Sequence, residues 1–174
     1  MCVVHVDAVF EERYWYPDDG AILWLSGYAI VAGDGRFLAR DAPELDARGL
    51  LVTNVAGAAR HHAAALDSDA AAPGSPLELR RDPSNEHDSN AIAVHVAGDP
   101  VGEQLGWVPR EIAARLAPEI DADRVDRVAT TWSAVALRES RRSPRDPRSG
   151  LTMLLARAPT VELRAVPRSQ PPRA

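Results

Sequence analysis

The fold is specified most clearly by the stretch Leu77–Val96, which reads LELRRDPSNEHDSNAIAVHV. Its two ends alternate apolar and polar residues with the period of two that is typical of a half-buried strand. Between them, Asp82–Ser89 is dense in Asp, Asn, Ser and Pro, which favour turns. The stretch therefore predicts two strands joined by a polar turn. The apolar face of the pair would hold Leu77, Leu79, Ile92, Val94 and Val96.

Short elements are expected on both sides of this pair. Downstream, Gly98–Pro100 predicts a turn and Leu105–Val108 a short strand. A helix should begin at Pro109, where the missing N–H of proline costs nothing, and Pro118 should end or kink it. Upstream, the sequence predicts a strand over Leu50–Val55 and one helical turn over Arg60–Ala65.

The two ends of the chain also indicate β-structure. Residues 1–42 predict a β-meander, with a third short strand at Arg36–Arg40; it is either a small subdomain or an extension of the main sheet. After the helix we expect a strand over Asp126–Leu137, a loop to Gly150, and closing strands at Leu151–Ala156 and Thr160–Ala165. The predicted organisation is a mainly β domain over residues 48–166, with residues 167–174 as a disordered tail.

Charge is distributed unevenly along the 174 residues, whose net charge is −5. All 20 basic residues are arginine; residues 1–137 carry a net charge of −11, and residues 138–174 a net charge of +6. An acidic body argues against tight, non-specific binding along a duplex, which needs many phosphate contacts. It is compatible with a small site that binds one end of a strand.

Location follows from simple features of the sequence. No apolar run has the roughly 18 residues that a membrane span needs, and the first residues do not have the pattern of a signal peptide. The single cysteine, Cys2, cannot form an internal disulfide. A cytoplasmic location is the expectation.

The residues of the central stretch and its flanks also match a known pattern. A strand ending in arginine is followed by Asn85, His87, Asp88, Asn90, Ala91, Ile92 and Val94, and then, after a gap, by Gly106, Trp107, Val108 and Pro109. Over roughly residues 50–137 this resembles the HIRAN domain, a DNA-binding module that is fused to SNF-type helicases and also stands alone in bacteria. Upstream, Val55-Ala56-Gly57 and Arg60-His61-His62 are similar to the family's glycine strand and its Arg-aromatic-aromatic segment.

The resemblance implies a fold and a function. The fold would be a small OB-like β-barrel with one or two short helices, and such barrels bind strands with a basic groove and aromatic platforms. The function would be recognition of the 3′ end of single-stranded DNA, without catalysis, cofactor or metal. A helicase or nuclease partner would then process the DNA, with repair, replication restart and defence all compatible.

Site residues carry over by position. His61, His62 and Trp107 would flank the terminal bases, and His87 takes the place of a usual aromatic. Asp88 would accept a hydrogen bond from a terminal hydroxyl, and Asn85 would fix the turn or contact the end nucleotide. Arg60 would pair with a phosphate, with Arg81 a second candidate. Because three positions that are often Tyr or Phe are histidine here, binding should be weaker and should strengthen at mildly acid pH.

Several of these residues also have a purely structural interpretation. Asp88 and Asn90 are suited to bonding the turn backbone, Trp107 to packing in the core, and His61 and His62 to an exposed helix face. The run Arg138–Arg148 is either a solvated loop or a basic arm that follows a strand backbone.

Two other classes of function stay open. The first is a protein-interaction module, which would expose an apolar patch elsewhere, with residues 10–28 as the candidate. The second is a metal-dependent hydrolase built on the histidines, although HxxxH, HExxH, CxxC and GxSxG spacings are absent. The sequence does not indicate the oligomeric state.

Overall fold

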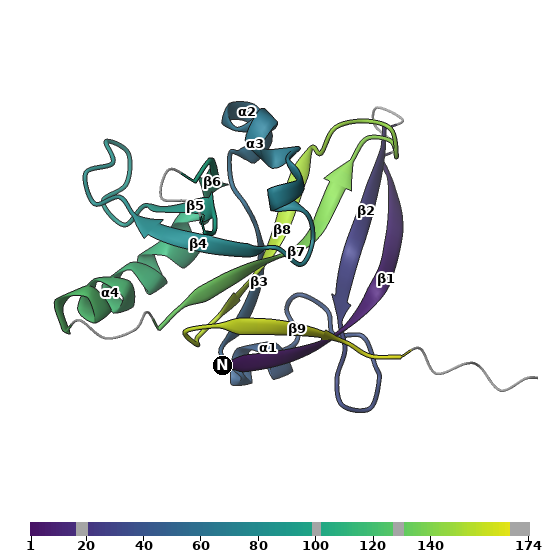
Figure 1. Ribbon diagram of the computed structural model, residues 1–174, viewed down its shortest axis with the longest axis horizontal. Coiled ribbons are helices and arrows are strands. Elements are labelled where there is room, and N and C mark those ends of the chain that lie inside the picture. Colours follow the sequence, from purple (N-terminus) through teal and green to yellow (C-terminus); the bar gives the residue numbers. More distant parts are fainter. Residues whose placement is uncertain (17–20, 99–101, 127–130, 168–174) are drawn as a thin grey trace, which may run out of the picture.

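A single mixed sheet organises the chain in the computed structural model, which describes residues 1–16, 21–98, 102–126 and 131–167 (Figure 1). The strand order is β6-β5-β4-β7-β2-β1-β9, and β8 pairs with both β3 and β7. The strands are β1 (Cys2–Tyr16), β2 (Ala21–Ile30), β3 (Leu50–Asn54), β4 (Pro76–Arg81), β5 (Ile92–Val96), β6 (Gln104–Trp107), β7 (Ser133–Arg141), β8 (Gly150–Ala156) and β9 (Val161–Ala165).

The prediction of a mainly β fold is confirmed, but the sheet is not closed into a barrel. Among the described residues, β6 and β9 lie at opposite ends of the strand order. The reason lies in the N-terminal hairpin: β2 pairs antiparallel with β7, and β1 pairs in parallel with β9. The hairpin therefore extends the main sheet outward, which settles the alternative that the sequence left open for residues 1–42.

The central hairpin forms over the predicted strands, and its predicted apolar residues share one face. Leu77 pairs with Val96, Leu79 with Val94 and Arg81 with Ile92. Its inner face packs against helix α4 (Arg110–Asp126). That core includes Ile92, Val94, Leu105, Ala113 and Leu116, each at most 1% exposed.

Two predictions about residues 36–47 are changed by the structure. The third strand expected at Arg36–Arg40 is not formed; Phe37 makes a single bridge to Val31 instead. Arg36 bonds Glu44 with Nη2 to Oε1 at 2.9 Å, and Glu44 lies in a short helix that the sequence did not indicate, α1 (Pro43–Ala47). This ion pair folds the segment into a compact turn. The turn at 17–20 lies outside the described residues.

Helices occupy the segments expected, with different bounds. The predicted helical turn becomes α2 (Ala58–His61) and α3 (Ala63–Leu66), followed by the 3-10 turn η1 (Asp69–Ala71). Of the two alternatives predicted for Pro118, an end or a kink of the helix, the end is not observed, since α4 continues to Asp126. Pro118 is exposed, so water can satisfy the one carbonyl that loses its donor, while Ala117 and Ile120 stay buried.

The last points concern the strand after α4, the C-terminal tail and membrane spans. The strand expected from Asp126 begins at Ser133, and residues 127–130 and the tail 168–174 lie outside the described residues. A search of the described helices finds none that is long and apolar enough to cross a membrane.

Candidate nucleic-acid interface

The candidate interface is built on the outer face of the β4-β5-β6 layer. Arg80, Ala93 and Trp107 stand side by side across the three strands. The next row holds Glu78, His95 and Gln104. In Figure 1 the turn after β4 and the α2–α3 segment lie above β4, and α4 lies below it. The core thus fills one side of the layer and leaves polar side chains on the other.

Arg80, Glu78 and His95 lie next to one another on this face. Arg80 binds Glu78 through Nε and Nη2 at 3.0 and 2.9 Å, which lowers the pKa of that carboxyl. His95 Nδ1 lies 2.7 Å from the Gly102 carbonyl oxygen. Because a carbonyl only accepts, this bond places the proton of a neutral His95 on Nδ1 and leaves Nε2 as an acceptor. Arg80 Nη1 lies 3.4 Å from the same nitrogen, which in this tautomer cannot accept a hydrogen bond from the guanidinium.

Trp107 joins β6 to the segment that leads into α2. Its backbone exchanges two hydrogen bonds with Ala56, at 2.8 and 2.9 Å. A Cβ added at Gly57 would lie 3.8 Å from Trp107 Cδ1 and 3.6 Å from His61 Cδ2. The Trp107 and His61 side chains therefore both lie next to this one glycine.

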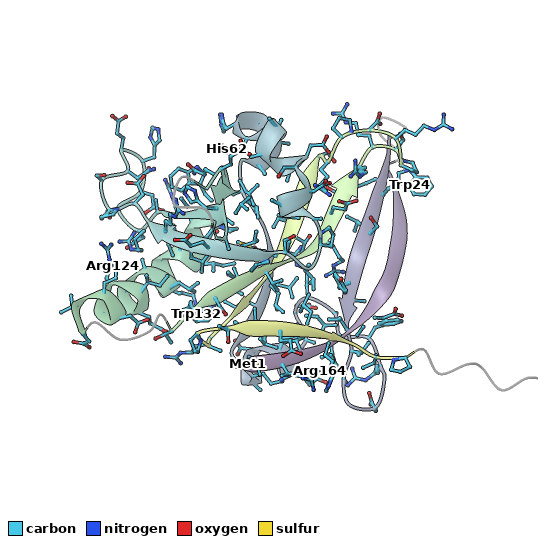
Figure 2. All side chains as sticks on the ribbon, viewed as in Figure 1. Met1, Trp24, His62, Arg124, Trp132 and Arg164 are labelled. Atoms are coloured by element: carbon cyan, nitrogen blue, oxygen red, sulfur yellow. The ribbon has the colours of Figure 1, made fainter. Side chains whose placement is uncertain are left out.

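The two adjacent histidines face each other edge to face. The His61 and His62 ring centroids are 6.3 Å apart, with an interplanar angle of 69°. His61 is exposed and His62 is half-buried beside α2 and α3 (Figure 2). Burial lowers the pKa of His62, and the nearby His61 and His95 lower it further. His62 is thus predominantly neutral at neutral pH, and His95 belongs to the same group of imidazoles.

The turn between β4 and β5 is held by its own side chains. Asp82 accepts hydrogen bonds from Ser84 Oγ at 3.1 Å and Asn85 Nδ2 at 3.2 Å. Asn85 Oδ1 in turn accepts from the His87 backbone N–H at 3.0 Å. Of the two roles predicted for Asn85, these contacts supply the one that fixes the turn. The His87 side chain is exposed.

Asp88 has one oxygen committed to the turn and one directed toward a cation. Its Oδ1 accepts from the Asn90 N–H at 2.9 Å, and its Oδ2 lies 3.8 Å from Arg110 Nε. Arg110, the first residue of α4, also donates from Nη2 to the His87 carbonyl at 2.8 Å. The Asp88 side chain is 19% exposed and that of Arg110 is 68% exposed. The Asp88 carboxylate and the exposed Arg110 side chain therefore lie together at the edge of the turn.

Arg81 is placed differently from the other predicted residues. Its side chain is only 4% exposed and forms a two-point ion pair with Asp121 of α4, both bonds at 2.9 Å. It also donates to the carbonyls of Ala91 and Ser89 at 2.7 and 3.0 Å. Four of its five N–H donors are used within the fold, so Arg81 ties the turn to α4.

The structure arranges the predicted site residues in two groups that are connected through the chain at Pro109 and Arg110. Trp107, His61 and His62 lie at the edge strand, and the turn with His87 and Asp88 is tied to the chain just after Trp107 through Arg110. Arg60 is exposed on α2. Sequence reasoning did not name Arg80, His95 or Arg110. Strand alternation is the signal for Arg80 and His95, because it places them on the face of the sheet that Leu79 and Val94 do not occupy. No pattern in the sequence marks Arg110.

The alternative functions receive little from the described residues. Across residues 1–16, 21–98, 102–126 and 131–167 there is no group of three His, Cys, Asp or Glu that could hold a metal ion. The apolar patch suggested for residues 10–28 falls largely outside the described side chains.

An open β-sheet with a polar, partly aromatic outer face defines a binding module, and comparison with known proteins identifies its family. The family model of the HIRAN domain matches residues 48–143, more than half of the chain, and the chain therefore belongs to the HIRAN family, a family of DNA-binding modules. A Fanconi-associated nuclease 1 homolog from rice (Oryza sativa subsp. japonica) is 42% identical over 53 residues. That match covers 30% of this chain and only 6% of the rice protein. The crystal structure of the HIRAN domain of human HLTF aligns with a TM-score of 0.41 and 23% identity, covering 63% of this chain and 77% of that one.

Proposed function

We propose that this chain recognises the 3′ end of a single DNA strand and has no catalytic activity of its own. The observation that carries the proposal is that the turn with Asp88 contacts Arg110, three residues after Trp107, whose ring lies near His61 at Gly57 in a DNA-binding fold. Asp88 Oδ2 has no hydrogen bond among the described residues, and it accepts one from the terminal hydroxyl. Trp107 and His61 stack against the last bases, a contact worth roughly 1–3 kcal/mol per base.

Two exposed arginines lie near these residues and are available to the phosphates next to the terminal nucleotide. Arg60 on α2 and Arg110 on the rim of the turn are both exposed. We infer that each contacts a phosphate of the bound strand, while Arg81 holds the turn in place. With so few cations against an acidic body, the affinity depends on the strand end and not on the length of duplex.

Discrimination between a 3′-hydroxyl and a 3′-phosphate tests the proposal directly. The wild-type chain should bind a 3′-hydroxyl oligonucleotide at least about ten-fold more tightly, since a phosphate loses the donated hydrogen bond and repels the carboxylate. In Asp88→Asn this preference should fall close to one, because the amide oxygen still accepts from the Asn90 N–H but the charge is gone. Fluorescence anisotropy at low salt measures all four affinities.

Glu86→Gln is the matched control, because it removes one carboxylate from the exposed part of the same turn. It should keep the ten-fold preference. A wild-type chain that binds both ends equally, or binds no oligonucleotide at low salt, would overturn the proposal and favour the protein-interaction alternative.

Strand binding should also strengthen as the pH falls. A protonated imidazole adds a positive charge near the phosphates, and the lowered pKa of His62 moves its share of this gain below the ordinary value of 6.5. We expect wild-type affinity to rise steadily from pH 7.5 toward about 5.5. His62→Gln should flatten the lower part of this curve.

His5→Gln is the control for the pH experiment, because His5 is exposed on β1, at the far end of the sheet. It should leave the pH profile unchanged. Circular dichroism at each pH verifies that the fold is intact. An affinity that stays flat across this range would show that the histidines act only as neutral rings.

The chain is expected to work with a partner that processes the DNA end. The rice relative is named as a nuclease, and its matching segment is a small part of a much longer protein. We infer that a module of this kind delivers a strand end to a nuclease or helicase, in DNA repair or a related process.

A further inference from the structure

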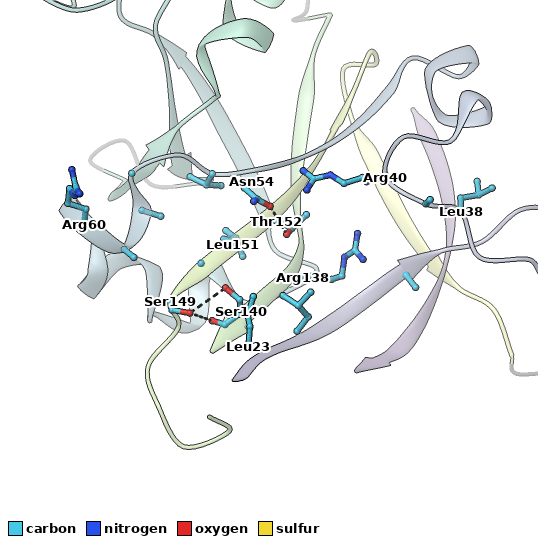
Figure 3. A pocket seen from close by; sticks show the side chains of 18 of the residues that line it. Leu23, Leu38, Arg40, Asn54, Arg60, Arg138, Ser140, Ser149, Leu151 and Thr152 are labelled. Atoms are coloured by element: carbon cyan, nitrogen blue, oxygen red, sulfur yellow. Dashed lines mark hydrogen bonds between the residues drawn. The ribbon is translucent and has the colours of Figure 1, made fainter. Parts of the chain in front are cut away.

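A groove of about 980 Å³ lies next to the proposed end site and is not used by it (Figure 3). Its walls come from β2, the segment 37–40 that follows the hairpin, the end of β3, the start of α2, and the β7–β8 pair. More than a third of this lining therefore belongs to residues 1–42, which lie outside the matched HIRAN region at 48–143. The volume is at the upper end of the roughly 300–1,000 Å³ that ligand pockets occupy.

The charge of the groove is opposite to that of the surrounding chain. Its lining includes Arg40, Arg60 and Arg138 but no Asp or Glu, although residues 1–137 carry a net charge of −11. Figure 3 shows Arg40 and Arg138 reaching toward the same opening from two sides. In the described part of the chain, Arg40 and Arg60 form no ion pair, and Arg40 makes one long bond, 3.4 Å, to the Val52 carbonyl. Such a lining selects an anionic occupant.

An aromatic ring stands exposed in the wall of this groove. Phe37 is 59% exposed. Its loop is braced, since Arg36 binds Glu44 at 2.9 Å and its backbone N–H donates to Asp34 at 3.0 Å. The Leu38 N–H donates to the Ile30 carbonyl at 2.9 Å on the other side. The ring is therefore held out toward solvent by a fixed backbone.

The groove and the proposed end site meet at two residues. Gly57 lines the groove, and it is also the glycine that Trp107 and His61 approach within 4 Å of an added Cβ. Arg60, three residues later on α2, belongs to both surfaces. The two surfaces are therefore contiguous at the start of α2.

We propose that this groove is a second subsite for the same single strand, taking nucleotides that precede the captured 3′ end. Phe37 stacks against a base, and Arg40 and Arg60 contact phosphates. This combination of exposed aromatic and cations is the general means by which single strands are bound without sequence preference. The inference rests on the proposed function, and it gives the N-terminal extension a role in extending the binding path.

Oligonucleotide length separates the two subsites. We compare 3′-hydroxyl strands of about 4 and about 12 nucleotides, the range of site sizes for one OB-type module. Phe37→Ala should weaken binding of the longer strand by at least about five-fold and leave the shorter one unchanged. Arg40→Ala should also weaken only the longer strand, and should reduce the slope of log affinity against log salt by about 0.7, the value for one lost phosphate contact on a single strand.

Matched controls lie on the far helix α4. Arg115→Ala removes an exposed arginine, and Val125→Ala trims a side chain that is 81% exposed; neither should change either affinity. Equal effects of Phe37→Ala on both strand lengths, or no effect on either, would overturn the groove subsite. If the groove variants act as expected but the 3′-hydroxyl preference and the Asp88→Asn effect are absent, the groove stands and the end-recognition proposal fails.

Discussion

Replacing Gly106 with alanine should destabilise the domain by at least about 3 kcal/mol. An added Cβ would lie 2.4 Å from the Ala56 carbonyl oxygen and 2.7 Å from Val55 Cγ1. The Ala56 oxygen accepts the Trp107 N–H, so relieving the clash breaks the link between β6 and the α2 segment. The φ of Gly106, +149°, adds backbone strain for any other residue. Urea unfolding followed by circular dichroism measures the loss.

Two other glycines separate the causes of this effect. Gly98 has a positive φ of +86° but open space around its Cβ position, so Gly98→Ala should cost only the backbone strain, about 1–2 kcal/mol. Gly33 has open space and an ordinary φ, and Gly33→Ala should be neutral within about 0.5 kcal/mol. If Gly106→Ala behaves like Gly98→Ala, then β6 can move away from Ala56 and the motif glycine is not needed for close packing.

The parts of the fold that the sequence predicts well are those set by local patterns. The β4-turn-β5 register follows from alternation, because a slip of one residue would turn Ile92 and Val94 out of the core. The open sheet was not predicted, because nothing local to residues 1–42 says which strands the hairpin pairs with. Pro118 shows the opposite limit: a strong local signal for a helix end is overridden by the burial of Ala117 and Ile120 on either side of it.

The same distinction applies to the site. Asp88 bonds the backbone of the turn, a role that its spacing indicated, whereas the ion pair of Arg81 could not be foreseen because its partner Asp121 is 40 residues away. Long-range ion pairs leave no mark on a single sequence. Whether an arginine binds DNA or holds the fold is therefore decided by its partners and not by its neighbours in sequence.

Arg148 is the strongest example, and Arg148→Ala should cost about 3 kcal/mol of unfolding free energy. The side chain is 7% exposed and pairs with Glu139. It also donates to the Leu66 and Ser68 carbonyls, some 80 residues away, at 3.2 and 2.5 Å. Removing it takes the donor from Oε2 of the half-buried Glu139 carboxylate, which keeps Arg141 on Oε1, and takes one donor from each of two carbonyls. Arg145→Ala, on an exposed position of the same loop, should be neutral, and both are measured by urea unfolding.

The pH dependence of stability identifies the ion pair as the cause. Burial acts to raise the pKa of Glu139, but hydrogen bonds and charges from Arg148 and Arg141 outweigh it and leave the pKa below its ordinary value of 4.5. A carboxyl with a depressed folded pKa contributes stability above its unfolded pKa, and this is lost as the pH falls through the folded value. Wild-type stability should therefore fall below about pH 4.5, and Arg148→Ala should show a smaller fall. Parallel acid profiles would instead assign the loss to packing of the arginine stem.

In either case the run Arg138–Arg148 partly holds the fold together, which leaves Arg142 and Arg145 as the exposed arginines that a basic arm would use.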